Sequence, residues 1–311
     1  MIVTVTLNAT MDRTLQVERM RTRGVLRARL LRLVPSGKGI NVSVGLGALG
    51  VRSTATGFVG DNEASAYRKF LQESGIVSEL IPVALRTRMN TTILWSHPRP
   101  GEVHLREVGD VLPSSALAKL RKTLKKLAGP RTVFVFSGSL PSKMSTGDFA
   151  GLLKAAGVRG SKICVDANGP ALAALRRSRV SLIAPNDDEL GELTGRRVGT
   201  VDTVAAAAKT LLDRIPTVLV TRGAKGAMAV RTDGIWRARV GLPKNRAVNS
   251  VGAGDAFLAS WLAAGSRRRR PEDCLACAVA AGAANALEPT AGTIQLKTYR
   301  KLLKSVVVSA V

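Results

Sequence analysis

Small residues and one acid stand together at Gly252-Ala253-Gly254-Asp255, directly before an apolar run long enough for about four helical turns. A helix that begins on such residues leaves backbone N–H groups uncovered, and these groups bind an anion. A carboxylate does not help to bind an anion beside it, so anion binding does not explain Asp255. We therefore predict that Asp255 acts as a base. It takes a proton from a hydroxyl, while the N–H groups of 252–254 stabilise the phosphoryl group that the hydroxyl attacks. The alternative is a helix cap, because the helix dipole favours an acid there.

A second glycine-rich motif is Gly37-Lys38-Gly39-Ile40-Asn41. The glycines on both sides of Lys38 leave the backbone free to approach a ligand, and the lysine adds a mobile charge. The motif differs from a Walker A loop, because Gly39 stands where Ser or Thr would bind magnesium. The glycines at 45–50 then fit G-x-G-x-x-G, but they lack the preceding strand, so they predict close helix packing and a glycine C-cap.

Two further motifs could serve a nucleotide. Asn186 and Glu189 are three residues apart at a predicted helix start, so their side chains share a face and could hold magnesium directly or through water. The alternative is a capping box. The stretch from Thr221 to Gly226 offers a glycine-rich bed for a nucleotide phosphate, or else it is a plain hairpin turn.

The elements that must position these residues alternate between strand and helix from residue 114 onward. Strands are predicted at 132–136, 162–165, 181–184 and 217–220, and each ends in a polar or glycine-rich loop. In an open α/β sheet such loops gather along one edge, so the active site belongs there. Asp12 follows the first strand and is a candidate for holding substrate hydroxyls. Residues 10–35 and 86–108 supply a second β layer that could cover the site, with Arg27 and Arg29 on one face of a strand.

Composition narrows the possible functions. The chain has 311 residues, 45% of them hydrophobic, and a formal charge of +25. Aromatic residues are 4% and the basic residues are widely spread, which disfavours nucleic-acid binding and favours a positive field for phosphorylated substrates. Apolar runs are too short for a membrane span or a signal peptide, which predicts a cytoplasmic protein. The three cysteines are expected to serve packing.

Five motifs occur in the order found in the ribokinase-like PfkB carbohydrate kinases: 37–41, 137–141, 185–189, 221–226 and 249–255. Their spacing resembles the branch of 1-phosphofructokinase and tagatose-6-phosphate kinase, and the similarity covers essentially the whole chain. The resemblance implies one ribokinase-like domain over 1–311. It would be an α/β fold of three layers, α/β/α, with a mostly parallel central sheet and a small β-sheet lid inserted at about 10–35 and 86–108.

The resemblance also implies an ATP-dependent kinase that uses Mg²⁺, with Asp255 as base and an anion hole at Gly252, Ala253 and Gly254. Contacts to sugar hydroxyls are expected at Asp12, Gly37, Gly39 and Asn41. Contacts around the substrate's own phosphate are expected at Arg27, Lys38, Arg88 and Ser137, with Asn90 nearby. Glu189 is expected at the metal, with Asn186, Thr221, Gly223 and Gly226 at the nucleotide. In the family the lid is often a dimer contact, which implies closure over the substrate and allows a homodimer.

The expected reaction is phosphoryl transfer from ATP to the free primary hydroxyl of a phosphorylated ketohexose, fructose 1-phosphate giving fructose 1,6-bisphosphate. Several cations near the acceptor favour a sugar phosphate over a neutral sugar. Within the family the alternatives are 6-phosphofructokinase and tagatose-6-phosphate kinase. From other classes, a non-catalytic sugar-phosphate sensor and a nucleic-acid-binding protein remain as alternatives.

Overall fold

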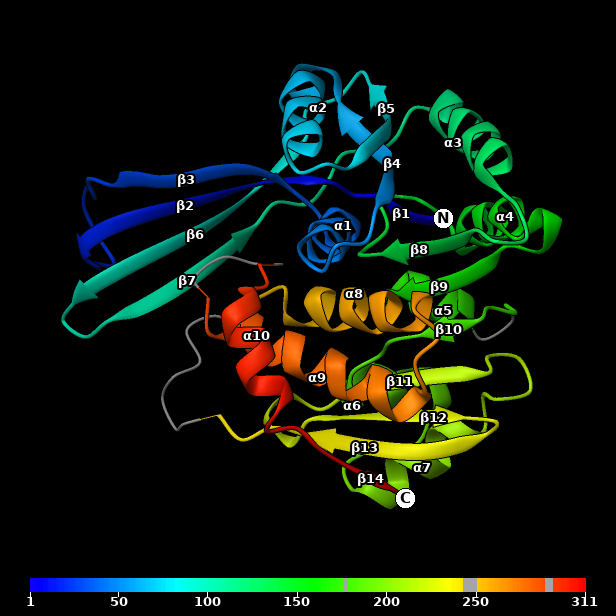
Figure 1. Ribbon diagram of the computed structural model, residues 1–311. Coiled ribbons are helices and arrows are strands. Elements are labelled where there is room, and N and C mark those ends of the chain that lie inside the picture. Colours follow the sequence, from blue (N-terminus) through cyan, green and yellow to red (C-terminus); the bar gives the residue numbers. More distant parts are fainter. Residues whose placement is uncertain (176–177, 243–250, 289–292) are drawn as a thin grey trace.

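The body of the protein is a ten-stranded sheet (Figure 1). The computed structural model describes residues 1–311 except 176–177, 243–250 and 289–292. In order across the sheet the strands are β14 (Val307–Ala310), β13 (Gly234–Arg239), β12 (Ala227–Arg231), β11 (Thr217–Thr221), β10 (Leu182–Ile183), β9 (Lys162–Asp166), β8 (Val133–Ser137), β1 (Ile2–Thr6), β4 (Ser53–Gly60) and β5 (Val77–Val83). The strands from β11 to β5 run parallel, and β12, β13 and β14 join antiparallel. The predicted mostly parallel sheet is therefore confirmed.

Helices cover both faces of this sheet, as a parallel sheet requires. Successive residues of β8 divide between the two sides: Phe134 and Phe136 belong to one apolar cluster and Val135 to the other. The first cluster takes its helical residues from α3 (Ser114–Leu127), α4 (Thr146–Ala156), α5 (Pro170–Ala174), α6 (Asp187–Thr194) and α7 (Val201–Lys209). The second takes them from α1 (Lys38–Ala48), α8 (Ala253–Ser266) and α9 (Pro271–Ala286). This arrangement is the expected three-layer α/β/α fold. None of the described helices is long and apolar enough to cross a membrane.

A smaller sheet projects from the body (Figure 1). Its strand order is β3 (Arg29–Ser36), β2 (Thr10–Arg19), β6 (Arg88–His97) and β7 (Gly101–Arg106). The central pair β2 and β6 is parallel, and the outer strands are antiparallel to them. The hydroxyl of Tyr67 ties this sheet to the body, because it lies 2.6 Å from the carbonyl oxygen of Thr10 and 3.0 Å from that of Ser36. Tyr67 lies in α2 (Ala64–Glu73), beside the sheet's attachment.

The remaining short elements are α10 (Leu296–Leu303) and the 3₁₀ turns Asp61–Glu63, Val158–Gly160 and Gly223–Lys225. The glycines at 45–50 lie in α1 and just after it, as expected. A Cβ on Gly45 would stand 2.8 Å from the Cβ of Ala259 in α8, and Gly50 has a φ of +74°. They therefore serve the close packing of α1 on α8 and the end of α1.

Candidate active site

Asp255 is the third residue of α8, and its carboxylate points away from its own helix cap. Gly252 is the N-cap with a φ of 81°, and no side chain caps the helix. Asp255 is only 3% exposed. Its Oδ2 accepts a hydrogen bond from Nδ2 of Asn41 at 2.9 Å, while Oδ1 is buried without a partner in the described part of the chain. The carboxylate contacts α1 and makes no side-chain cap, although Asp255 is the acid in the first turn of α8, where the helix dipole favours it.

Burial raises the pKa of Asp255 to about 6, because desolvation disfavours the charged carboxylate. The ammonium of Lys38 and the hydrogen bond from Asn41 lower this pKa, and the charge of Asp166 raises it. A carboxylate with such a pKa is ionised at neutral pH and still basic enough to take a proton.

The backbone at the start of α8 is open toward a ligand. A Cβ on Gly254 would meet no atom within 4 Å, and the left-handed turn at Gly252 aims the chain into the helix. The side chain of Asn285 holds this turn, because its Nδ2 donates to the carbonyl oxygen of Val251 at 3.0 Å. Among the described residues no side chain caps α8, so its first N–H groups, those of residues 252–254, are of the kind that binds an anion. Asn249 and Ser250, the first residues of the motif, lie outside the described residues.

Lys38 reaches across the sheet edge to Asp166, the last residue of β9. Its Nζ donates to both carboxylate oxygens of Asp166, at 3.1 and 3.3 Å, and the Oγ of Ser137 donates to Oδ2 at 3.3 Å. Negative charges around Lys38 raise its pKa. Asp166 contributes most, and Asp255 and Glu189 contribute further. Asp166 directly follows the strand predicted at 162–165, and no local sequence pattern indicates its pairing with Lys38.

The glycines beside Lys38 have a packing reason of their own. A Cβ on Gly37 would come within 2.6 Å of the Thr6 side chain, and a Cβ on Gly39 within 2.5 Å of it. The start of α1 therefore lies directly on the end of β1, where no larger residue fits.

Asp12 and Asn90 face each other in neighbouring strands of the small sheet, and Nδ2 of Asn90 donates to Oδ1 of Asp12 at 3.2 Å. Arg88 donates to the carbonyl oxygens of Asn8 and Glu107, both at 3.1 Å, and burial lowers its pKa. Within the described residues, Nε of Arg88 and Oδ1 of Asn90 are buried without hydrogen-bond partners. Such buried atoms cost stability unless a ligand or water satisfies them. The charge of Asp12 also raises the pKa of Asp255.

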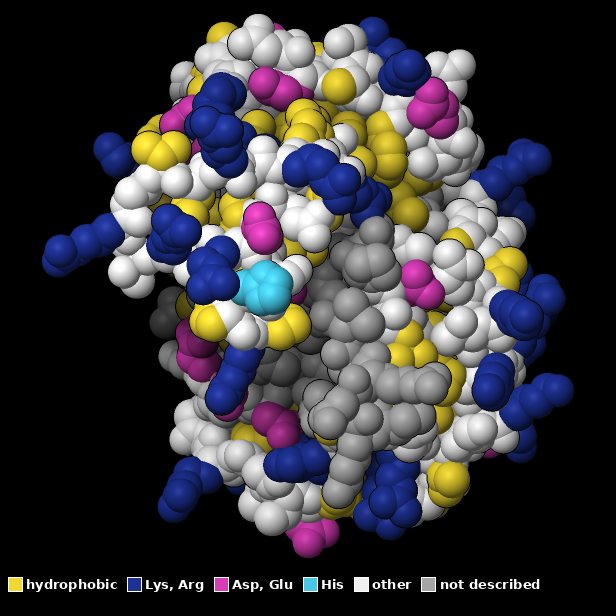
Figure 2. Space-filling view, turned by 90° about the vertical axis from the view of Figure 1, so that its left-hand side faces the viewer, with side chains coloured by type: hydrophobic (Ala, Val, Ile, Leu, Met, Phe, Trp, Pro, Cys, Tyr) yellow, Lys and Arg dark blue, Asp and Glu magenta, His cyan; other side chains and the backbone are white. Residues whose placement is uncertain are grey.

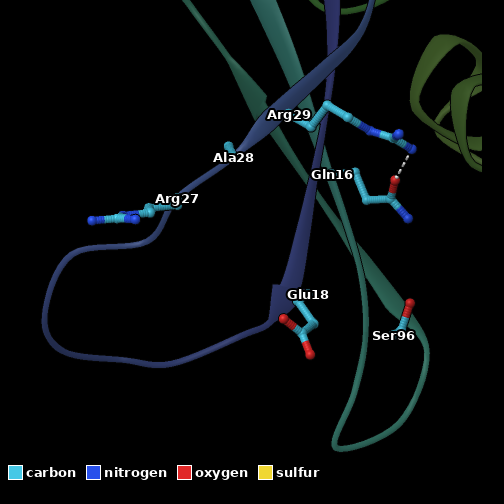
Figure 3. Close-up of a pocket in the computed structure, with 6 residues that line it drawn as sticks. All are labelled: Gln16, Glu18, Arg27, Ala28, Arg29 and Ser96. Carbon is cyan, nitrogen blue, oxygen red and sulfur yellow. Dashed lines mark hydrogen bonds between the residues drawn. The ribbon is translucent and has the colours of Figure 1, made fainter.

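Arg27 does not join these residues. It is exposed, precedes β3, and lines an open depression toward the far end of the small sheet together with Gln16, Glu18, Ala28, Arg29 and Ser96 (Figure 3). Arg29 instead bonds Gln16, and Figure 3 shows the two arginines pointing to opposite sides. The prediction that they share one face of a strand is wrong, because β3 begins only at Arg29.

On the nucleotide side, the capping box at Asn186 is present. Oδ1 of Asn186 accepts from the Glu189 N–H at 2.8 Å, and Oε2 of Glu189 accepts from the Asn186 N–H at 2.9 Å. The predicted hairpin is present too, since 221–226 joins the antiparallel pair β11 and β12. Gly226 packs so tightly that a Cβ would stand 2.1 Å from the Ala238 carbonyl oxygen, whereas Gly223 faces open space. The residues of this cap and this turn can therefore serve the fold and still contact a ligand.

Two contacts join the capping box to this hairpin. The Thr221 N–H donates to the carbonyl oxygen of Pro185 at 3.0 Å. The Nε of Arg222 donates to both oxygens of Asp187, at 3.0 and 3.2 Å, from a side chain that is 5% exposed. Arg222 is a second residue whose partner lies outside any local pattern.

The residues fit a magnesium ion of the kind that accompanies a nucleotide. The described part of the chain holds no cluster of three or more His, Cys, Asp or Glu side chains suited to a metal. Mg²⁺ commonly binds through one or two carboxylates, with waters and substrate phosphates as further ligands. The capping box uses Oε2 of Glu189 and leaves Oε1 for such a role. Burial raises the pKa of Glu189, and Lys38 lowers it.

A buried carboxylate, a helix start without a side-chain cap and a lysine lie at one edge of an α/β sheet, an arrangement suited to phosphoryl transfer. The chain belongs to the pfkB family of carbohydrate kinases, whose family model matches residues 3–298. It is a carbohydrate kinase with relatives named 1-phosphofructokinase. The relative from Vibrio cholerae is 28% identical over 99% of this chain and 96% of its own. The relative from Xanthomonas campestris is 33% identical, over 84% and 83%.

Phosphofructokinase-2 from Escherichia coli has the same fold, with a TM-score of 0.91 at 24% identity over 97% of this chain and 98% of that one. That protein has also been solved with fructose-6-phosphate and in a tetrameric inhibited form. Ribokinase from Arabidopsis thaliana shares the fold as well, with a TM-score of 0.70 at 20% identity over 97% of this chain and 98% of that one, so the ribokinase-like fold is confirmed.

Proposed function

We propose that the protein transfers the terminal phosphoryl group of ATP to the free primary hydroxyl of a phosphorylated ketohexose, with fructose 1-phosphate as the acceptor. The observation that carries this proposal is the buried carboxylate of Asp255 at the start of α8, one oxygen of which has no partner among the described residues. The relatives named 1-phosphofructokinase support this choice of acceptor.

In this reaction Asp255 accepts the proton of the acceptor hydroxyl while that oxygen attacks the terminal phosphorus of ATP. The bond from this phosphorus to the bridging oxygen breaks, ADP leaves, and the proton remains on Asp255. The N–H groups of Gly252, Ala253 and Gly254 and the ammonium of Lys38 stabilise the charge on the transferred group. Because these donors are fixed before the substrate arrives, they need little reorganisation.

Two residue sets hold the substrates in this proposal. Sugar hydroxyls are bound by Asp12, Gly37, Gly39 and Asn41, and the acceptor's phosphate by Lys38, Arg88 and Ser137, with Asn90 beside them. The unpartnered Nε of Arg88 supports this role, because a phosphate oxygen would satisfy it. Arg27 stays outside this set in the single chain.

The nucleotide is assigned to Asn186, Thr221, Gly223 and Gly226. Mg²⁺ is assigned to Glu189, directly or through water, and supplies positive charge at the phosphates when bound. Oε1 of Glu189, which the capping box does not use, and the space at Gly223 within the described residues support these assignments.

The small sheet is assigned two roles: a lid over the acceptor and a contact between two copies. The lid role is supported by Asp12 and Asn90, which come from its strands. The dimer role is supported by an apolar face of the same sheet, on which Leu30 and Leu105 are each 54% exposed. The substrates of such a kinase are cytoplasmic metabolites, so we place the protein in the cytoplasm.

The charge of +25 fits this proposal better than nucleic-acid binding. Figure 2 shows Lys and Arg side chains scattered over the whole visible face rather than gathered into a stripe. A spread positive field attracts phosphorylated substrates without forming a nucleic-acid groove.

The proposal is tested by measuring ADP release with fructose 1-phosphate, fructose 6-phosphate, tagatose 6-phosphate, fructose and ribose. We expect the highest kcat/KM with fructose 1-phosphate. Preference for either 6-phosphate would reassign the acceptor within the family. Binding of a sugar phosphate without ADP release would indicate a sensor. Steeply salt-dependent binding of DNA or RNA, without ADP release, would favour the nucleic-acid alternative.

A further inference from the structure

Asp166 is a buried carboxylate that pairs with Lys38 and has no assigned role. Its side chain is 8% exposed, whereas that of Lys38 is 39% exposed. Two contacts hold Asp166 in place. The hydroxyl of Ser137, the last residue of β8, donates to the Asp166 carboxylate at 3.3 Å, and the N–H of the next residue, Gly138, donates to the Asp166 carbonyl oxygen at 2.9 Å. Lys38 is thus anchored on its buried side by a fixed carboxylate and is open on its other side.

This anchor matters because a lysine has a long, flexible stem and three N–H donors. The bond to both oxygens of Asp166 fixes where the ammonium stands and leaves donor capacity on its open side for a phosphate. Without the anchor, the ammonium would sample other positions and meet the phosphoryl group less often in the required geometry.

We propose that Asp166 is a positioning residue, whose carboxylate fixes the ammonium of Lys38 beside Asp255 for its contact with phosphate groups. The inference rests on the proposed kinase function and adds a role to that site. Asp166 acts through Lys38 and makes no contact with the substrate itself.

The pair also acts on the base, which gives the test its direction. The Asp166 charge raises the pKa of Asp255, and the Lys38 charge lowers it. Asp12 raises it too, Asn41 lowers it by hydrogen bonding, and burial raises it most. Removing the charge of Asp166 should therefore move the acid limb of the kcat/KM profile to lower pH, and removing that of Lys38 should move it to higher pH.

The experiment compares the full-length protein with Asp166→Asn, Asp166→Glu and Lys38→Met, using whichever sugar phosphate the wild type prefers. For Asp166→Asn we expect kcat to fall by about tenfold to a hundredfold and the sugar-phosphate KM to rise, because Lys38 is also assigned to the acceptor's phosphate. Its acid limb should move down, and that of Lys38→Met should move up. Asp166→Glu keeps the charge, so its acid limb should stay near the wild-type position and part of kcat should return.

Asp233→Asn is the matched control, because Asp233 pairs with Arg231 at an exposed turn outside this site; its kcat and profile should not change. Normal kcat with an unmoved limb in Asp166→Asn would overturn the inference. A raised Mg²⁺ requirement with an unmoved limb would also overturn it, because Asp166 would then serve the metal. If Asp166→Asn fails to fold, an unmoved limb in Lys38→Met overturns the inference and an upward shift supports it. A wild type that phosphorylates no sugar would instead refute the proposed function.

Discussion

At the scale of single residues, Asp255 combines burial with an incomplete set of hydrogen bonds. A purely structural carboxylate would have both oxygens satisfied, because an unpartnered buried polar atom costs stability. Here Asn41 satisfies one oxygen, and the other has no partner in the described part of the chain. This is the arrangement expected of a base whose proton donor is the substrate.

The direct consequence concerns turnover. In Asp255→Asn the side chain keeps its size but cannot accept the proton, so we expect kcat to fall by about a thousandfold or more, with a KM change of only a few fold. Steady-state ADP release with the preferred sugar measures both constants. Asp233→Asn, which removes an exposed carboxylate, should leave both constants unchanged. Near-normal turnover in Asp255→Asn would exclude the base assignment.

Burial of Asp255 also predicts that Asp255→Asn, which lowers kcat, raises the stability of the folded protein. In the folded protein the pKa of Asp255 is about 6, above the value of about 3.9 for an unfolded chain. The ionised group therefore costs stability above about pH 6, and the cost vanishes below about pH 4, where both states are protonated. We expect Asp255→Asn to raise the free energy of unfolding at pH 7 by about 1 to 3 kcal/mol and to differ little at pH 4, as measured by urea unfolding. A loss of stability at pH 7 would contradict this account.

At the scale of elements, the sequence located the strands and the loops that end them. Period and turn signals predicted the parallel core, and the alternation expected from residue 114 onward begins with α3, Ser114–Leu127. The pairing of Lys38 with Asp166, 128 positions away, was not predictable. Such pairs depend on which strand ends become neighbours, and no local pattern encodes that. For the same reason, the sequence predicted ligand contacts for Gly37 and Gly39 but not their close packing against Thr6.

The contact between Arg222 and Asp187 also joins two elements, the start of α6 and the hairpin after β11. Because both elements are assigned to the nucleotide, we expect Arg222→Met to raise the KM for ATP by about threefold to tenfold and to leave the sugar-phosphate KM unchanged. Arg231→Met removes an arginine of the neighbouring strand β12, whose partner Asp233 lies in an exposed turn, and should change neither KM. Equal rises in both constants for Arg222→Met would indicate general loosening of the sheet rather than a local link.

At the scale of the whole molecule, the small sheet has two unlike faces. Strand register places Asp12 and Asn90 on one face with Arg32, Thr92 and His104. His104 bonds Thr92 at 3.0 Å and Glu102 at 3.2 Å, so the histidine has partners that its sequence surroundings did not reveal. The polar face suits a lid over a charged substrate.

The opposite face is apolar and is the basis of the last prediction. By register it carries Leu15, Leu30, Leu33, Ile93, Val103 and Leu105, with Arg13 and Thr91 between Leu33 and Leu105. Leu33 is 45% exposed and Leu105 is 54% exposed, although both lie on a sheet that projects from the body (Figure 1). Exposed leucines on both sides of this face favour a second copy of the same sheet, since a two-fold contact pairs like with like.

We therefore expect a homodimer at micromolar concentration by sedimentation velocity, and a monomer in the double variant Leu33→Asp/Leu105→Asp, because two copies would bury four unpaired carboxylates. Leu296→Asp is the matched control: this leucine is 38% exposed but lies in α10, outside the sheet, so the variant should stay dimeric. A monomeric wild type, or a double variant that remains dimeric, would refute the sheet as the contact. Because the proposed lid and the proposed contact share the same strands, loss of the dimer should also raise the sugar-phosphate KM more than the KM for ATP.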